Sequence, residues 1–131
     1  MKIYLKFFIS ILMFSNSLSA QYQSLYTTTP NQIVVPNEER EDIYNGITIV
    51  SKVTEPAYQY FRVKEDNAKR PCVIIYPGGG YVILATSHEG VDVAKFFNSI
   101  GINAMVVKYR IPNEKTQTDK KIAPLQDAQQ A

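Results

Sequence analysis

The sequence predicts an α/β fold, and three observations carry that prediction. Residues 73–75 (Val-Ile-Ile) form a short apolar run of β-branched residues between turn residues, which is typical of a strand buried on both faces of a parallel sheet. Residues 77–80 (Pro-Gly-Gly-Gly) end that run, and residues 89–100 then place apolar side chains at helical spacing. Residues 102–107 (Ile-Asn-Ala-Met-Val-Val) are a second buried-type strand. Strand, turn, helix and strand in this order form a βαβ unit.

The bulk composition indicates one ordinary globular domain. The chain has 131 residues, of which 45% are hydrophobic and 20% are charged. Its net charge of +2 comes from Lys2 and Lys6, which lie in a segment that we expect to be removed, so nucleic acid is not a predicted partner. Cys72 is the only cysteine and is predicted to be a small core residue. His88 is the only histidine, and no Cys/His metal spacing occurs, so a zinc site is not expected.

Three segments are predicted along the chain. Residues 1–20 have the positive charge, short apolar core and small-residue end of a secretory signal peptide. Their apolar core is too short to be a membrane anchor, so the protein is predicted to be extracytoplasmic, either periplasmic or secreted. Residues 21–44 are a polar, extended lead-in, and residues 45–131 form the folded domain.

The first half of the domain is predicted to be an antiparallel hairpin. Residues 47–53 have strand composition and follow the turn signal Asn45-Gly46. Residues 58–63 alternate with period two and form the expected second strand. Because only a short turn at Pro56 separates the two runs, their pairing with each other is the simplest expectation.

The last third of the chain predicts a loop and the beginning of a helix. Residues 109–121 are polar and contain a proline, and residues 123–131 start a helix with Pro124 in its first turn. A layered α/β domain needs helices on both faces of its sheet, and one complete helix is too few. We therefore expect this sequence to be the amino-terminal part of a larger domain, ending early in the helix after the fourth strand.

The glycine turn has two possible chemical uses. A dinucleotide-binding turn is not supported, because Ile83 stands where the third glycine belongs and residues 108–110 (Lys-Tyr-Arg) supply no carboxylate after the next strand. No phosphate-binding Gly-Lys-Ser/Thr occurs either. An oxyanion hole is supported, because a glycine run after a buried strand matches the position that supplies its backbone donors in α/β-hydrolases. A merely tight turn is the remaining alternative.

Five short blocks carry a family resemblance: residues 76–81, 87–90, 101–104, 108–110 and 124–128. Together they resemble the start of secreted bacterial α/β-hydrolase esterases, similar to hormone-sensitive-lipase-like and feruloyl or acetylxylan esterases. Pro77 stands where many members have a histidine before the glycines, as in the carbohydrate-esterase-like branch. The resemblance implies a serine ester hydrolase that needs no cofactor and acts on small-molecule or polysaccharide-linked esters.

Roles for individual residues follow from this resemblance. It implies that the amides of Gly79 and Gly80 line the oxyanion hole and that Gly78 permits the turn. It also implies that Tyr81 stands at the mouth of the acyl or sugar pocket and that Tyr109 lies near the same rim. Packing is the alternative role for both tyrosines.

Two charged residues near the carboxyl end are given structural roles. Arg110 is predicted to form an ion pair or to anchor a loop, rather than to bind substrate. Asp127 is predicted to be an exposed or capping carboxylate of the last helix.

The reactive side chains of such an enzyme are not recognisable in this sequence. No serine sits in a Gly-x-Ser-x-Gly elbow, and Ser87-His88-Glu89 are adjacent residues that rarely converge on one atom. His88 is instead predicted to be a loop hydrogen-bonding residue that caps the helix or shapes the pocket. The nucleophile, acid and base are therefore expected beyond residue 131, and the chain alone is expected to be inactive. A prolyl-oligopeptidase-like peptidase and a non-catalytic binding module remain alternatives.

Overall fold

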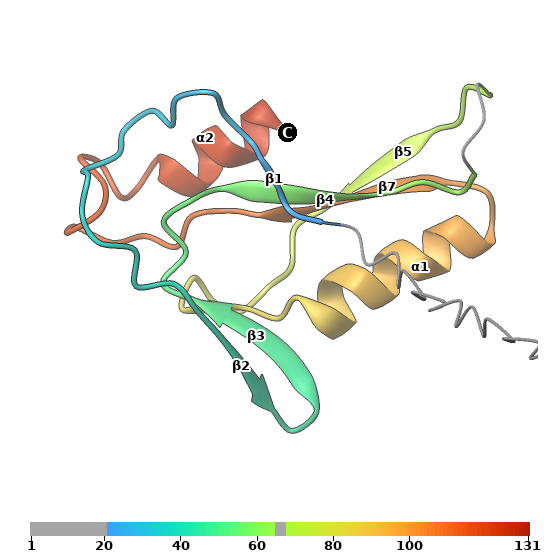
Figure 1. Ribbon diagram of the computed structural model, residues 1–131, viewed down its shortest axis with the longest axis horizontal. Coiled ribbons are helices and arrows are strands. Elements are labelled where there is room, and N and C mark those ends of the chain that lie inside the picture. Colours follow the sequence, from blue (N-terminus) through green and yellow to red (C-terminus); the bar gives the residue numbers. More distant parts are fainter. Residues whose placement is uncertain (1–20, 65–67) are drawn as a thin grey trace, which may run out of the picture.

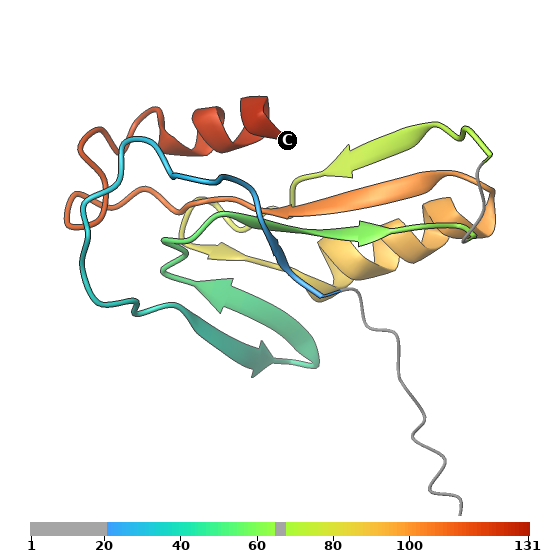
Figure 2. The same cartoon turned by 45° about the horizontal axis from the view of Figure 1, so that its top comes forward.

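The computed structural model describes residues 21–64 and 68–131, so the predicted signal peptide lies outside the described residues. The main layer is a mixed sheet of four strands with helix α1 on one side and helix α2 on the other (Figures 1 and 2). Its strands, in spatial order, are β1 (Gln23–Ser24), β4 (Ala57–Phe61), β7 (Asn103–Lys108) and β5 (Cys72–Ile75). The predicted α/β class is confirmed.

Strand β7 is the centre of the sheet, and it confirms the predicted βαβ unit. It pairs in parallel with β5 and antiparallel with β4. The connection from β5 to β7 contains one π-helical turn, η1 (Ser87–Val91), which continues directly into α1 (Asp92–Ser99). Within the described ranges, no helix combines the length and the apolar character needed to cross a membrane.

One face of the sheet packs against this helical segment. Ala94 of α1 is fully buried against Ala104 and Val106 of β7. Gly90 allows the close approach, because a Cβ at this position would lie 2.9 Å from Val106 Cγ1 and 3.2 Å from Pro77 Cγ. The helix thereby fixes the loop before it, which contains the glycine turn, relative to the sheet.

The expectation that residues 73–75 are buried on both faces is wrong. Strand β5 is at the edge of the sheet, and its alternate residues have different environments. Val73 and Ile75 face the cluster around α1, whereas Ile74 is 43% exposed and Cys72 is also exposed. Cys72 is therefore not the core residue that was predicted. The continuous apolar run could not show that, among the described residues, only one face of β5 is covered.

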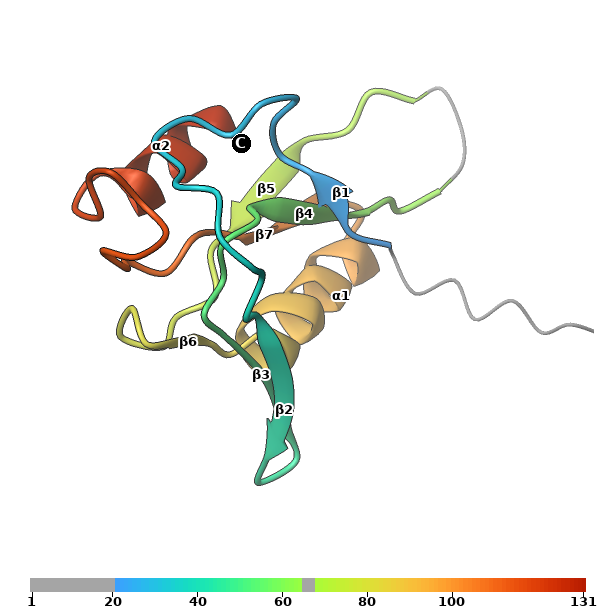
Figure 3. The same cartoon turned by 60° about the vertical axis from the view of Figure 1, so that its left-hand side comes forward.

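The predicted pairing of residues 47–53 with residues 58–63 is wrong, and a different hairpin forms. Strand β3 (Ile47–Ser51) pairs with β2 (Arg40–Tyr44), which lies inside the expected extended lead-in. The turn between them is Asn45-Gly46, with φ of 49° and 78°, as a tight two-residue turn requires. Strand β4 pairs instead with β1 and β7. The β2–β3 hairpin extends away from the main sheet (Figure 3).

The remaining segments agree with the sequence except at three places. Helix α2 (Ala123–Gln130) forms as predicted, with a proline in its first turn. Residues 81–88, between the glycine turn and the predicted helix, contain two elements that the sequence did not indicate: β6 (Ile83–Leu84) pairs with β3, and η1 begins at Ser87. Ile100, the last residue of the range predicted to be helical, is 56% exposed and lies just beyond α1, which ends at Ser99.

A buried ion pair joins the end of β7 to α2. Arg110 and Asp127 both have fully buried side chains, and Nη2 of the arginine lies 2.7 Å from Oδ1 of the aspartate. The Asp127 carboxylate also accepts from the Arg110 backbone N–H (2.8 Å), and Arg110 Nη1 donates to the Pro30 carbonyl (2.7 Å). The predicted ion-pair role of Arg110 is confirmed. The prediction for Asp127 is wrong, because helical spacing does not reveal that α2 presents it to the arginine.

Tyrosine ionisation should make the protein less stable at alkaline pH. Burial, and then the Asp127 carboxylate, raise the pKa of Tyr26 from 10.0 to about 12. The folded state therefore holds this proton more tightly than the unfolded chain does, and the resulting stability is complete below pH 10. We expect the free energy of unfolding to fall as pH rises from about 10 to about 12, and urea titrations at stepped pH measure it. Tyr26→Phe should flatten this dependence, and an unchanged slope would contradict the assignment.

Candidate active site

The glycine turn follows the carboxyl end of β5 and has an unusual backbone. Gly79 has φ of +143°, Gly80 of +63° and Tyr81 of +60°. Glycine populates this half of backbone space without steric cost, whereas a residue such as Tyr81 rarely adopts it. A Cβ on Gly79 would overlap the backbone carbonyl of Ile83, so this position admits only glycine. Backbone geometry thus explains why the motif has glycine at position 79.

The carbonyl groups of Gly78 and Gly79 accept hydrogen bonds, whereas the amides of Gly79 and Gly80 are free. The Gly78 carbonyl accepts from Ala85 N–H (2.9 Å), and the Gly79 carbonyl accepts from Val82 N–H (3.1 Å) and Ile83 N–H (3.2 Å). Among the described residues, no acceptor receives the N–H of Gly79 or Gly80. Each free N–H belongs to a peptide plane whose carbonyl is already fixed. The turn therefore presents two oriented, unused backbone donors.

Two side chains hold the peptide group that precedes these donors. The hydroxyl of Tyr109 donates to the Pro77 carbonyl (2.8 Å), and the Gly78 N–H donates to Oε2 of Glu89 (2.7 Å). Burial raises the pKa of Tyr109, with further contributions from Tyr81 and Glu89, so its hydroxyl stays protonated. The sequence did not identify Glu89 as a site residue. Glu89 lies eleven residues after Gly78 in the sequence, and this spacing does not indicate that the two residues are in contact. The contact arises only because the helical segment packs beside the turn.

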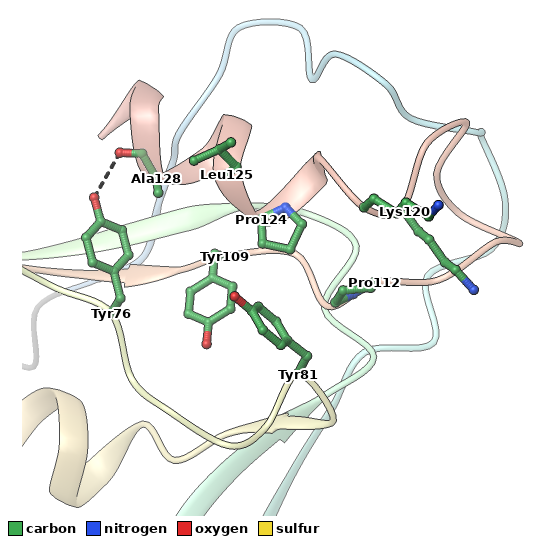
Figure 4. A pocket seen from close by; sticks show the side chains of 9 residues that line it. Tyr76, Tyr81, Tyr109, Pro112, Lys120, Pro124, Leu125 and Ala128 are labelled. Atoms are coloured by element: carbon green, nitrogen blue, oxygen red, sulfur yellow. Dashed lines mark hydrogen bonds between the residues drawn. The ribbon is translucent and has the colours of Figure 1, made fainter.

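A cavity of about 550 Å³ opens beside the turn (Figure 4). Three tyrosines form one side of it, with ring centroids 6.4 Å apart for each of the pairs Tyr76–Tyr109 and Tyr81–Tyr109. Helix α2 forms the opposite side, and the Tyr76 hydroxyl donates to its Ala128 carbonyl (2.9 Å). The rest of the lining is Pro112, Lys120, Lys121, Pro124 and Leu125.

Both tyrosines named from the sequence line this cavity, in different ways. Tyr81 is 61% exposed at the end of the glycine turn, whereas Tyr109 is buried and holds Pro77. Tyr76 and Leu125 were not predicted from the sequence as site residues. In the structure both side chains are exposed and line the cavity. Tyr76 directly follows a strand, so its alternation with Ile75 could have placed it on the face opposite α1.

The Ser87-His88-Glu89 sequence does not form a catalytic triad. Ser87 Oγ accepts the backbone N–H of Thr48 (2.9 Å), which ties it to β3. His88 lies inside η1 rather than at a helix cap, and its Nε2 is 3.6 Å from Oε1 of Glu89. Oε2 of Glu89 accepts a hydrogen bond from the Gly78 N–H. Across the described ranges, no three His, Cys, Asp or Glu residues gather as a metal site would require.

Short segments of the chain are similar in sequence to two characterised enzymes. Over 48 residues the chain is 38% identical to an acetylxylan esterase of Xylanibacter ruminicola, and over 44 residues it is 46% identical to endo-1,4-beta-xylanase B of Butyrivibrio fibrisolvens. These segments amount to 37% and 34% of the chain, but only to 10% and 7% of the two relatives. No family model matches the chain.

A solved structure shows the same arrangement over most of the chain. The acetyl ester-xyloside bifunctional hydrolase of Caldicellulosiruptor lactoaceticus superimposes with a TM-score of 0.58 and 27% identity. The superposition covers 85% of this chain and 34% of the hydrolase. The fold described here thus corresponds to part of an α/β-hydrolase fold, and its neighbours in sequence and structure are hydrolases of acetylated and xylan-type substrates.

Proposed function

We propose that this chain supplies the oxyanion hole and one wall of the substrate pocket of an extracytoplasmic serine ester hydrolase. The observation that carries the proposal is the pair of unused N–H groups of Gly79 and Gly80 beside an aromatic cavity. When a nucleophile attacks an ester carbonyl, negative charge develops on the carbonyl oxygen, and fixed backbone donors stabilise that charge. The similarity to an acetylxylan esterase supports acylated carbohydrate as the substrate class.

The glycine turn and the tyrosines have different roles in this reaction. Gly79 and Gly80 bind the oxyanion, and the rings of Tyr76 and Tyr81 pack against the acyl or sugar group. The attacking serine and its acid and base partners come from beyond residue 131. Acyl transfer of this kind passes through an acyl-serine and needs no cofactor.

The activity is tested with the full-length protein that contains this chain. We expect it to release acetate from acetylated xylan and to hydrolyse 4-nitrophenyl acetate, while the 131-residue chain does neither. A serine-directed phosphonate should abolish the activity. Cleavage of proline-containing peptides without esterase activity would favour the peptidase alternative. Binding of xylan without turnover of any ester would favour the binding-module alternative.

The pocket assignment makes a separate prediction for Tyr81. In the full-length enzyme, Tyr81→Ala should raise KM for an acetylated xylooligosaccharide by roughly tenfold, because an exposed aromatic wall is lost, and should change kcat less. Steady-state kinetics separate the two parameters. Tyr44→Ala is the matched control, because Tyr44 is 66% exposed on strand β2 and does not line the cavity. Equal KM changes in both variants would contradict the pocket assignment.

A further inference from the structure

The peptide group between Pro77 and Gly78 is held from two opposite edges. Its carbonyl oxygen accepts the Tyr109 hydroxyl at 2.8 Å, and its N–H donates to Glu89 Oε2 at 2.7 Å. Because both atoms belong to one planar unit, the two bonds together fix the orientation of that plane. A single bond would leave it free to rotate about the contact.

The two side chains that hold this peptide come from separate elements. Tyr109 directly follows the central strand β7, and it is buried in the core cluster on the α2 side of the sheet. Glu89 belongs to η1, the turn that packs against β7 through Gly90. The peptide is therefore fixed relative to the sheet by one bond and relative to the helix by the other.

The orientation of this peptide matters because the turn beyond it lacks side-chain support. Gly78, Gly79 and Gly80 have no side chains of their own. Apart from the Gly78 N–H bond to Glu89, their hydrogen bonds within the described residues join them to backbone groups of residues 82–85. The plane that carries the Gly79 N–H is joined to the held plane through one residue, Gly78. A rotation of the first plane would displace the Gly79 donor.

We propose that Glu89 and Tyr109 are positioning residues that lock the Pro77–Gly78 peptide and thereby aim the N–H groups of Gly79 and Gly80. The inference rests on the proposed esterase function and deepens it. Neither side chain touches the reacting ester. Both act through the backbone, so they should affect stabilisation of the transition state more than binding of the substrate.

Three variants of the full-length protein test the kinetic consequence. Glu89→Ala removes the acceptor, Tyr109→Phe removes the donor but keeps the ring, and Glu89→Gln keeps an acceptor oxygen at the same reach. We expect Glu89→Ala and Tyr109→Phe to lower kcat for 4-nitrophenyl acetate by about tenfold to a hundredfold, with KM changed less than about threefold. Glu89→Gln should retain most of the activity. Asp92→Ala removes a nearby exposed carboxylate of α1 as the matched control and should leave kcat unchanged.

A second measurement reports the lock without any turnover. In protein labelled with ¹⁵N-glycine, the Gly78 amide should exchange with solvent faster in Glu89→Ala than in the wild type or in Glu89→Gln.

If the wild type proves inactive on every ester, the proposed function fails, while the exchange rate of the Gly78 amide still shows whether Glu89 holds this peptide. If the wild type is active and neither Glu89→Ala nor Tyr109→Phe changes kcat or exchange, the positioning role is overturned. If Glu89→Ala fails to fold, the other two variants still test the positioning role. Tyr109→Phe must then lower kcat, and Glu89→Gln must retain it.

Discussion

Replacing Asp127 with leucine is expected to destabilise the protein by about 3–5 kcal/mol, the range found when one partner of a buried ion pair is removed. Leucine is larger than aspartate and leaves no cavity, so the loss comes chiefly from charge and hydrogen bonding. The substitution would leave the fully buried Arg110 guanidinium without its anion. Denaturant unfolding monitored by circular dichroism measures the change.

Two further variants make this expectation specific. Replacing both residues together, with Arg110→Met and Asp127→Leu, removes the charges as a pair and should restore much of the stability. Glu38→Gln breaks an exposed ion pair with Lys52 and should leave the unfolding transition nearly unchanged. If Asp127→Leu were no more harmful than Glu38→Gln, the buried pair would not stabilise the fold as described.

Replacing Gly79 with alanine should lower kcat/KM of the full-length enzyme by about a hundredfold or more, the cost of losing an oxyanion donor. The added Cβ would lie 2.9 Å from Ile83 Cγ1 and would also overlap the Ile83 backbone carbonyl. The turn would have to change shape, and the donor would move with it. Steady-state kinetics with an acetylated substrate measure this loss.

Two other glycines with positive φ separate this effect from general backbone strain. Gly46 has φ of +78° at the tip of the β2–β3 hairpin, and a Cβ there meets nothing within 4 Å. Gly46→Ala should therefore carry only the left-handed strain of about 1–2 kcal/mol and leave kcat/KM unchanged. A Cβ on Gly80 would also meet nothing within 4 Å, so Gly80→Ala should lower kcat/KM by an intermediate amount. Full activity of Gly79→Ala would contradict the assigned turn geometry.

Much of the architecture was predictable because local chemistry and tertiary structure agree there. The strand at 103–108, the helix after the glycine turn and the helix beginning at Ala123 all form as their periodicity indicates. The tight turn at Asn45-Gly46 is also real. Its partner strand was missed because residues 40–44 are exposed along their whole length and show no buried stripe.

The candidate site was only partly predictable, because its parts come from distant segments. The glycine turn and the two tyrosines Tyr81 and Tyr109 could be named from a local motif and from the family resemblance. Tyr76 and Leu125 became recognisable only when α2 was seen to lie over the same face of the sheet (Figure 4). Glu89 required the distance between its carboxylate and the Gly78 amide.

The sequence by itself determined the βαβ unit and the place of the glycine turn, because strand and helix periodicity and the φ freedom of glycine are local properties. Only the tertiary structure decided that β5 lies at a sheet edge, that β4 pairs with β7, and that Asp127 is buried against Arg110. These outcomes depend on which surfaces meet after folding. Contacts between residues far apart in the chain leave no periodic signal along it.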